Sequence, residues 1–186
     1  MLRVISGELK GRRLKTPNWD GLRPTSDKLR ETLFNVVAER VAGARVLDLY
    51  AGTGAIGIEA LSRGAAHVTF VETDARARKL IDENLRLCGV SDRYVIIRTP
   101  QSLPAGSIDL AVLDPPYDVP DLTASIAAAE PLMAPGGLLV LEHARRRSAP
   151  EQVGRLGIAR DLVSGDSALA FYSEVAEQRG TYQPVR

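Results

Sequence analysis

Residues 46–57 read Val-Leu-Asp-Leu-Tyr-Ala-Gly-Thr-Gly-Ala-Ile-Gly, a short apolar strand that runs through a glycine-rich turn into a helix. Gly52 and Gly54 let the backbone pass close to a ligand because neither residue has a Cβ atom. Ligands of open α/β sheets bind at the carboxyl ends of the strands, where such turns lie. The stretch therefore predicts an α/β fold with a ligand site after this strand. The alternative is a tight turn without a ligand.

Strands alternate with helices along the rest of the chain. Further strands are predicted at 68–71, 94–97, 110–113 and 138–141, helices at 75–87 and 122–133, and a last hairpin at 158–163 and 168–175. Near-continuous apolar strands between helices imply a mostly parallel sheet covered on both faces, with an antiparallel strand at the edge. We predict one domain over residues 25–176, with an extension over 1–24 and a polar tail over 177–186.

The N-terminal extension is predicted to form a β-hairpin from two alternating stretches, 2–6 and 12–16. A loop follows, and then a helix with apolar residues at helical spacing from Leu29 to Val41, for which Thr25 or Ser26 is the expected N-cap. Residues 1–30 carry eight Lys or Arg against three Asp or Glu, which leaves residues 31–186 with a net charge of −4. A basic end on an acidic domain suits phosphate binding. A solvated basic surface is the alternative.

Composition excludes several classes of protein. The 186 residues are 45% hydrophobic and 25% charged, with a net charge of +1, which is typical of a globular domain. No apolar run approaches the roughly 18 residues that a membrane-spanning helix needs, and the first residues do not resemble a signal peptide. The single cysteine, Cys88, excludes an internal disulfide and a cysteine-built metal site. We expect a cytoplasmic protein without a bound metal.

The acids around the glycine turn distinguish between two kinds of ligand. The spacing Gly52-x-Gly54-x-x-Gly57 also matches a dinucleotide fingerprint, so a nicotinamide enzyme is the main rival. Asp48, inside the strand end, suits the cationic amino group of an amino-acid ligand. Glu72, after the next strand, is placed to accept hydrogen bonds from ribose hydroxyls, whereas Asp74 is expected to cap the next helix. A ligand that is both amino acid and nucleoside is S-adenosylmethionine.

Residues 109–117 read Asp-Leu-Ala-Val-Leu-Asp-Pro-Pro-Tyr, an apolar strand that runs into an acid, two prolines and an aromatic residue. Because proline lacks an N–H, this segment offers mainly hydrogen-bond acceptors. The Asp114 carboxylate and the Pro115 carbonyl can hold the two hydrogens of an exocyclic amine, and Tyr117 offers a face for base stacking. With Pro116, these residues are the predicted catalytic site. The alternative is a strand terminator with a loop carboxylate.

At this point the chain resembles a known family, the bacterial small-subunit ribosomal RNA guanine-N2 methyltransferases. The resemblance covers nearly the whole chain, and its most specific parts are residues 5–7, 11–14, 23–27, 30–35 and 57–65. It implies a Rossmann-like fold with a seven-stranded sheet, S-adenosylmethionine as cofactor, and a guanine of 16S ribosomal RNA in the assembled or assembling small subunit as substrate. It also implies that residues 23–27 cover the cofactor and that the hairpin contacts RNA.

The candidate residues form three sets. The predicted cofactor residues are Thr25, Asp48, Tyr50, Gly52, Gly54, Glu72, Thr73 and Gln101. Gln101 is included as a substitute, because a proline, Pro100, stands near the place of the acid or amide that often meets the adenine amino group in this family. The predicted RNA-binding residues are Arg3, Lys10, Arg12, Arg13, Arg23 and Arg145. Glu142 and His143, near Arg145, are interpreted as an ordinary strand-end carboxylate and a surface histidine.

Three alternatives stay open. A DNA adenine-N6 methyltransferase also uses Asp-Pro-Pro-Tyr, but such enzymes usually carry extra mass that reads the duplex. A protein methyltransferase acting on glutamine or an N-terminus is the second, although Asp rather than Asn before the two prolines argues against glutamine. The third is a cofactor-binding module without activity. We expect a monomer, because the RNA-facing edge would otherwise be crowded.

Overall fold

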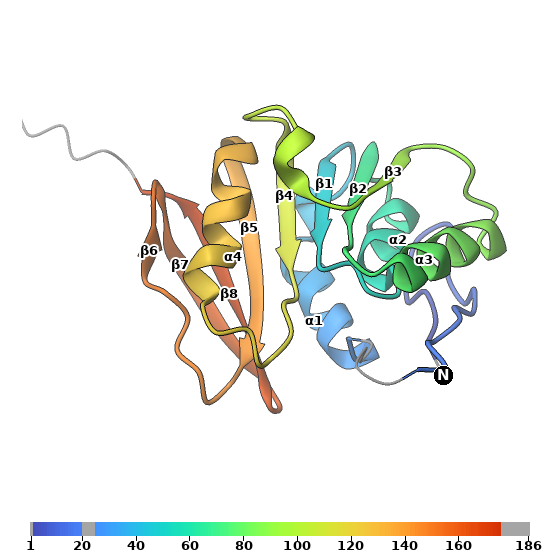
Figure 1. Ribbon diagram of the computed structural model, residues 1–186, viewed down its shortest axis with the longest axis horizontal. Helices are drawn as coiled ribbons and strands as arrows, with labels where there is room; N and C mark the ends of the chain where they lie inside the picture. Colours follow the sequence, from blue (N-terminus) through green and yellow to red (C-terminus); the bar gives the residue numbers. More distant parts are fainter. Residues whose placement is uncertain (1, 20–24, 176–186) are drawn as a thin grey trace, which may run out of the picture.

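One mixed sheet organises the molecule (Figure 1). The computed structural model describes residues 2–19 and 25–175. The strands are β1 (Arg45–Leu49), β2 (His67–Val71), β3 (Tyr94–Ile97), β4 (Ile108–Leu113), β5 (Met133–Ala144), β6 (Gln152–Val153), β7 (Leu156–Ser164) and β8 (Ser167–Glu174). Their order is β3-β2-β1-β4-β5-β8-β7-β6, in which β1 to β5 are parallel and β8 runs antiparallel between β5 and β7. The predicted α/β sheet with an antiparallel terminal strand is confirmed.

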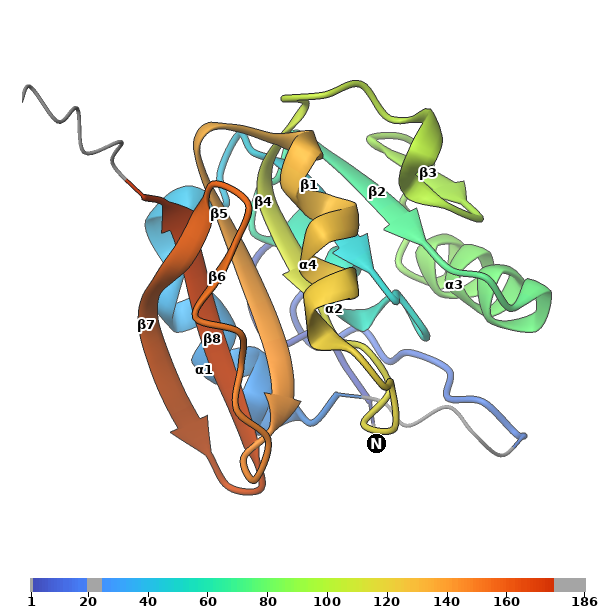
Figure 2. The same ribbon diagram turned by 60° about the vertical axis from the view of Figure 1, so that its left-hand side comes forward.

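Helices cover both faces of the sheet. The α-helices are α1 (Asp27–Val36), α2 (Ala55–Ser62), α3 (Ala75–Leu87) and α4 (Leu122–Ala129), and short 3-10 turns lie at Ala38–Arg40, Pro100–Ser102 and Glu130–Leu132. Apolar side chains of α1, α2 and α3 share one core with Val46 and Val112, whereas those of α4 share the other with Leu47 and Leu113. The two cores use alternate residues of the same strands, as expected when both faces of a sheet are buried. In Figure 2, α4 crosses in front of the strands.

The sequence-based boundaries of two helices and one strand differ most from those in the structure. The predicted helix 122–133 ends at Ala129, because Pro131 cannot continue an α-helix and restricts the residue before it. The helix from Ser26 ends at Val36 and tightens into a 3-10 turn, a common way for a helix to finish. Strand β5 starts at Met133 rather than at residue 138, and β6 adds an eighth strand.

The arms of the predicted N-terminal hairpin pair with each other but do not form strands. The N–H groups of Val4 and Leu14 donate to the carbonyls of Arg12 and Leu2, at 2.9 and 3.0 Å, yet only one β-bridge forms, between Arg3 and Arg13. The ladder stops there because the next amides bind a side chain of α2 instead. These residues are called the N-terminal arm below, defined as residues 2–15.

Glu59 of α2 anchors the N-terminal arm. Its buried carboxylate accepts hydrogen bonds from the N–H groups of Ile5 and Ser6, at 2.7 and 3.0 Å, and from Nε of Arg63. Arg30, which is also fully buried, lies 3.9 Å from Glu59 and donates to the carbonyl of Arg3. At Gly7 a Cβ atom would come within 1.9 Å of the Ser62 carbonyl, so only glycine allows this close approach. The arm is therefore part of the packed structure.

Candidate active site

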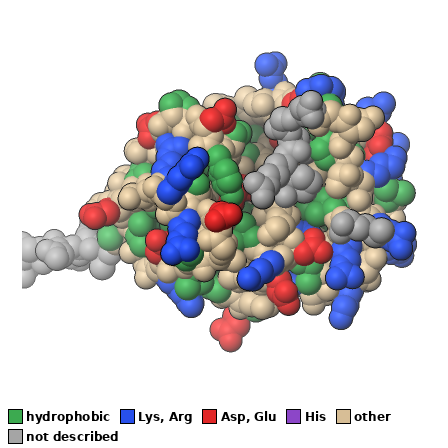
Figure 3. Space-filling view, turned by 90° about the horizontal axis from the view of Figure 1, so that it is seen from below, with side chains coloured by type: hydrophobic (Ala, Val, Ile, Leu, Met, Phe, Trp, Pro, Cys, Tyr) green, Lys and Arg blue, Asp and Glu red, His purple; other side chains and the backbone are tan. Residues whose placement is uncertain are grey.

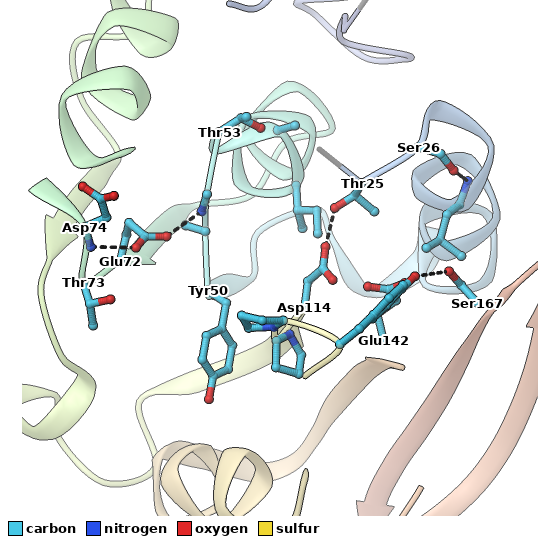
Figure 4. A pocket seen from close by; sticks show the side chains of 18 of the residues that line it. Thr25, Ser26, Tyr50, Thr53, Glu72, Thr73, Asp74, Asp114, Glu142 and Ser167 are labelled. Carbon is cyan, nitrogen blue, oxygen red and sulfur yellow. Dashed lines mark hydrogen bonds between the residues drawn. The ribbon is translucent and has the colours of Figure 1, made fainter. Parts of the chain in front are cut away.

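A cavity of about 600 Å³ opens at the carboxyl edge of the sheet. Its walls come from the segments that follow β1, β2 and β4, from Glu142 of β5 and Ser167 of β8, and from Trp19 and the starts of α1 and α2. Figure 3 looks onto this edge of the molecule, where Lys and Arg side chains are spread on both sides. Figure 4 shows the cavity from close by, with Asp114 near its centre and Glu72 at one side.

The glycine turn after β1 has the conformation that its sequence predicts. Gly52 and Gly54 have φ angles of 55° and 77°, in the left-handed region that glycine adopts without cost. Tyr50 has a φ of 71°, which costs a non-glycine residue roughly 1–2 kcal/mol. Its amide donates to the Val71 carbonyl at 3.1 Å, and its hydroxyl lies 2.9 Å from Oγ of Ser125. Backbone strain held in this way is typical of a functional site.

The third glycine has a different role. A Cβ atom on Gly57 would lie 2.2 Å from the ring of Phe70, so this glycine allows α2 to pack directly on β2. Gly57 also donates its N–H to Oδ2 of Asp48 at 2.9 Å. The helix thus begins close to the strand, with its first turn held over a buried carboxylate.

Asp48 lies at the base of the turn and is 1% exposed. Its Oδ1 is buried without a hydrogen-bond partner in the described part of the chain. Burial raises the pKa of Asp48 to about 7, the Gly57 N–H opposes the shift, and the charge of Glu72 adds to it. A carboxylate held in this way favours a cation beside it.

Glu72 follows β2 and shapes the neighbouring wall of the cavity. One carboxylate oxygen accepts the Gly52 N–H at 2.9 Å, and the other accepts the Asp74 N–H at 2.8 Å (Figure 4). Each oxygen keeps a second lone pair for a ligand hydroxyl. Asp74 caps α3 by accepting the Arg76 N–H, as its sequence position predicts. Thr73 lines the cavity beside it.

Asp114, Pro115, Pro116 and Tyr117 line the other half of the cavity. The Thr25 hydroxyl donates to Oδ2 of Asp114, so Thr25, predicted as a cofactor residue, contacts the amine site. Burial, and then the neighbouring Glu142, hold the pKa of Asp114 well above its usual value. The Val119 N–H donates to the Pro116 carbonyl at 3.0 Å. Among the described residues no donor reaches the Pro115 carbonyl.

Arg147 fixes the segment that follows Tyr117. Its guanidinium donates to the carbonyls of Val119 and Pro120, the second at 3.0 Å. Residues 145–147 are three consecutive arginines, and this sequence pattern by itself does not predict the contact. The bidentate geometry of arginine suits the clamping of two adjacent carbonyls.

Glu142 is the site residue that sequence reasoning missed. It is 5% exposed, lines the cavity, and accepts a hydrogen bond of 2.8 Å from the Tyr117 hydroxyl. The same hydroxyl lies 2.7 Å from Oγ of Ser167. A signal existed in the sequence, because Asp114 and Glu142 each follow an apolar run of the same kind, at the ends of two strands.

The remaining predicted residues have mixed placements. Gln101 is exposed on its 3-10 turn and is not among the residues that line the cavity. His143 is 4% exposed, so its interpretation as a surface histidine is wrong. It is buried because β8 pairs along this part of β5, with His143 opposite Ala168. Trp19, which the sequence did not single out, lines the cavity with Arg76 5.1 Å from its ring centroid.

The predicted RNA-binding side chains are exposed wherever the structure describes them: Arg3, Lys10, Arg12, Arg13 and Arg145. Arg3 lies 3.6 Å from Asp27 in an exposed ion pair. Arg23 lies outside the described residues. Over residues 2–19 and 25–175, no helix is long and apolar enough to cross a membrane. In the same ranges, no group of three or more His, Cys, Asp or Glu side chains is arranged to hold a metal ion.

The chain is similar to known proteins over almost its full length. The family model described as "Conserved hypothetical protein 95" matches residues 2–173. A Bacillus subtilis protein named "Putative rRNA methyltransferase YlbH" is 36% identical over 182 residues, covering 93% of this chain and 99% of the relative. "Ribosomal RNA small subunit methyltransferase D" of Escherichia coli is 32% identical over 181 residues, with coverages of 95% and 91%. A solved structure described as "Putative methyltransferase yhhF from Escherichia coli" has a TM-score of 0.82 at 28% identity, with coverages of 95% and 99%.

Proposed function

The chain belongs to the family described as Conserved hypothetical protein 95, and from that premise we propose that it methylates ribosomal RNA with S-adenosylmethionine. The target is the exocyclic N2 of a guanine in 16S ribosomal RNA, within the assembled or assembling small subunit. The name of the Escherichia coli relative, a small-subunit ribosomal RNA methyltransferase, supports the class of substrate. The Rossmann-like methyltransferase fold supports the class of reaction.

One observation carries the proposal. Two segments line the same cavity: Asp114 with Pro115, which offer hydrogen-bond acceptors, and the glycine turn after β1. The first suits an exocyclic amine, and the second suits a ligand with which the backbone makes close contact. A methyl donor bound at the glycine turn and an amine bound at Asp114 would therefore meet in the same cavity.

The residues present fit S-adenosylmethionine. Asp48 does not itself line the cavity, but its buried Oδ1 has no hydrogen-bond donor in the described part of the chain and suits the cationic amino group of the methionine moiety. The Glu72 carboxylate, fixed by two backbone amides, suits the ribose hydroxyls. When bound, the cofactor supplies a methyl group on a sulfonium, which is a good leaving group. Thr73 and the backbone at Gly52 complete this proposed cofactor site. Gly54, which was also predicted for it, does not line the cavity, and a Cβ atom there would lie 3.1 Å from Ile81 in the core.

The protein's own contribution is mainly positioning. Asp114 and the Pro115 carbonyl accept the two amine hydrogens, which directs the nitrogen lone pair at the methyl group. With the cofactor bound, the methyl group would pass from the sulfonium to the nitrogen, and the Asp114 carboxylate or water would take up the proton that the nitrogen releases. A nucleophile held about 3–3.5 Å from the methyl carbon gains most of the available rate acceleration.

RNA is the substrate that suits this arrangement. A guanine N2 in a duplex is occupied by base pairing, so the base must be unstacked or already free to enter the cavity. The exposed Tyr117 ring, at 45%, offers a stacking face at the cavity wall. The N-terminal arm and Arg145 would bind backbone phosphates around it.

The test is methyl transfer from labelled S-adenosylmethionine to small ribosomal subunits that lack this modification. Protein-free 16S RNA and duplex DNA are run in parallel. We expect label in the RNA of the subunit, recovered after digestion as N2-methylguanine. Label found only in DNA adenine or only in protein would contradict the proposed substrate while leaving the fold and the family unaffected.

A further inference from the structure

We propose that Glu142 makes the site specific for guanine by accepting a hydrogen bond from N1–H of the target base. Asp114 accepts from the neighbouring N2 amine at the same time. This inference rests on the proposed function and adds a residue that selects the base. Strand register, burial and the hydrogen bonds around Glu142 support it.

Strand register places the two carboxylates side by side. Leu113 of β4 pairs with Leu141 of β5 in parallel register, so Asp114 and Glu142 are the next residues on adjacent strands. Neighbouring strands lie roughly 4.8 Å apart. Leu113 and Leu141 point into the core beneath α4, so the following residues point to the opposite face. Figure 4 shows both carboxylates at the same end of the cavity.

The environment of Glu142 lacks the partner that a buried carboxylate normally has. Within the described ranges the Tyr117 hydroxyl donates to it at 2.8 Å, and the Asp114 carboxyl is close enough to share a hydrogen bond with it. No Lys or Arg there forms an ion pair with it. Buried carboxylates are usually paired with a cation or with several hydrogen-bond donors. Because Glu142 lines the cavity, the missing donor can come from a bound base.

Guanine presents the matching pattern of donors. Its Watson–Crick edge carries N1–H directly beside the N2 amine, so two adjacent carboxylates can each accept from one group. Adenine has an unprotonated N1 beside its N6 amine, and cytosine has an unprotonated N3 beside its N4 amine. In either base, the lone pair of this unprotonated ring nitrogen would face the lone pairs of the Glu142 carboxylate, which is unfavourable. The pair of acids therefore favours guanine over every other common base with an exocyclic amine.

The bound base also relieves a repulsion within the empty site. The two carboxylates are close enough for Glu142 to raise the pKa of Asp114, in addition to the effect of burial. Donors from one guanine would stabilise both negative charges together. An adenine would require a protonated Glu142, because its N1 accepts a hydrogen bond instead of donating one.

The test compares guanine with 2,6-diaminopurine, which keeps the N2 amine but has an unprotonated N1. Mass spectrometry locates the guanine that the wild-type protein methylates, and ligated RNA carries the analogue at that position. We expect wild-type kcat/KM to favour guanine by roughly ten- to a hundredfold, as expected when a buried acceptor loses its donor. In Glu142→Gln the amide can face either edge, so the preference should fall at least roughly tenfold.

Two controls separate specificity from folding and from the proposed function. Cofactor affinity of Glu142→Gln should equal that of the wild type, and Glu151→Gln, an exposed change of the same kind, should keep the wild-type preference. An unchanged preference in Glu142→Gln, with N2-methylguanine as the product, would overturn the role of Glu142 alone. Methyl transfer to a base other than guanine by the wild type would overturn the proposed function and this inference together.

Discussion

Asp48 shows how a single residue can lower stability in favour of ligand binding. Its carboxyl group is buried, and its pKa is raised from 3.8 to about 7. A group whose pKa is raised on folding destabilises the folded state increasingly as the pH rises from about 4 to about 7. With about 1.4 kcal/mol for each pH unit, the cost approaches roughly 4 kcal/mol above pH 7. A bound cation would recover much of this free energy.

Asp48→Asn should therefore raise the Tm of the cofactor-free protein at pH 8 and weaken the binding of S-adenosylmethionine. The amide keeps an acceptor for the Gly57 N–H but carries no charge. At pH 5, where the wild-type carboxyl is mostly protonated, the two Tm values should converge. Calorimetry at both pH values measures this, with exposed Asp92→Asn as control. A lower Tm for Asp48→Asn at pH 8 would contradict the cost assigned to this charge.

Wild-type affinity for the cofactor should also depend on pH, with the sign that Asp48 dictates. Below pH 7 the carboxyl of Asp48 takes up a proton and no longer attracts the amino group of the ligand. We expect Kd to rise up to about tenfold for each pH unit below 7. In Asp48→Asn this dependence should be absent. Titration calorimetry between pH 5 and 8 distinguishes the two patterns.

Asp114 has the opposite role, since it should affect the reaction and leave the cofactor in place. Asp114→Ala removes an acceptor that positions the amine, and we expect kcat to fall by at least roughly 10². Thr25→Val, which removes only the hydroxyl that donates to Asp114, should cost less, roughly tenfold. Single-turnover methyl transfer and cofactor titration are measured on the same samples. Loss of cofactor binding in Asp114→Ala would show that the two roles are not separate.

At the scale of elements, sequence periodicity is most reliable where strands are buried on both faces. The predicted strand 68–71 lies within β2, an interior strand of the sheet in which all four of these residues are buried. Strand β5 is longer than predicted because Pro135 and two glycines read as a turn. In the structure these residues lie in an irregular stretch of the β4–β5 pairing, and the strand continues across it.

The position of Glu142 could not be predicted for a related reason. Its partner Asp114 is fixed by the register between β4 and β5, which are separated along the chain by α4. Local patterns identify each strand end but do not align two of them. The glycine turn and the Asp-Pro-Pro-Tyr segment were identifiable because each carries its chemistry within a few consecutive residues.

Glu59 offers a test of how α2 holds the N-terminal arm. Glu59→Ala leaves the amides of Ile5 and Ser6 without their acceptor. It also removes the buried carboxylate that lies 3.9 Å from the buried Arg30, which keeps its hydrogen bonds to Asp27 and to the Arg3 carbonyl. Breaking such a buried pair costs about 3–5 kcal/mol. We expect hydrogen exchange of the arm to accelerate while β1 and β4 stay protected. Glu83→Ala, which removes the exposed pair with Lys15, should change little. Uniform loss of protection in Glu59→Ala would show that the arm and the sheet unfold as one unit.

At the scale of the whole molecule, the basic arm and the cavity are joined by a short, ordered connection. The Lys15 N–H donates to Asn84 of α3 at 2.7 Å, and the amide of Asn84 donates to the Thr53 carbonyl in the glycine turn at 2.9 Å. Trp19, four residues further along, lines the cavity. The end of the arm at Lys15 therefore lies near the cavity, whereas its turn lies at the other end of α2, where the Leu9 N–H donates to Ser62.

This arrangement predicts how RNA binding depends on salt. Arg12 and Arg13 are exposed, and no ion pair engages either of them among the described residues. If each contacts a phosphate, Arg12→Glu or Arg13→Glu should reduce the slope of log K against log salt by about 0.7–0.9 and weaken binding to all RNA sequences alike.

Arg160→Glu, an exposed change on β7 near the far edge of the sheet, is the matched control and should leave the slope unchanged. Filter binding at salt concentrations from about 50 to about 200 mM measures the slope for all three variants, because the affinity for RNA changes strongly over this range. Equal slopes for the wild type and both arm variants would exclude the arm from the RNA surface, and the base would then have to reach Asp114 from the side of Arg145.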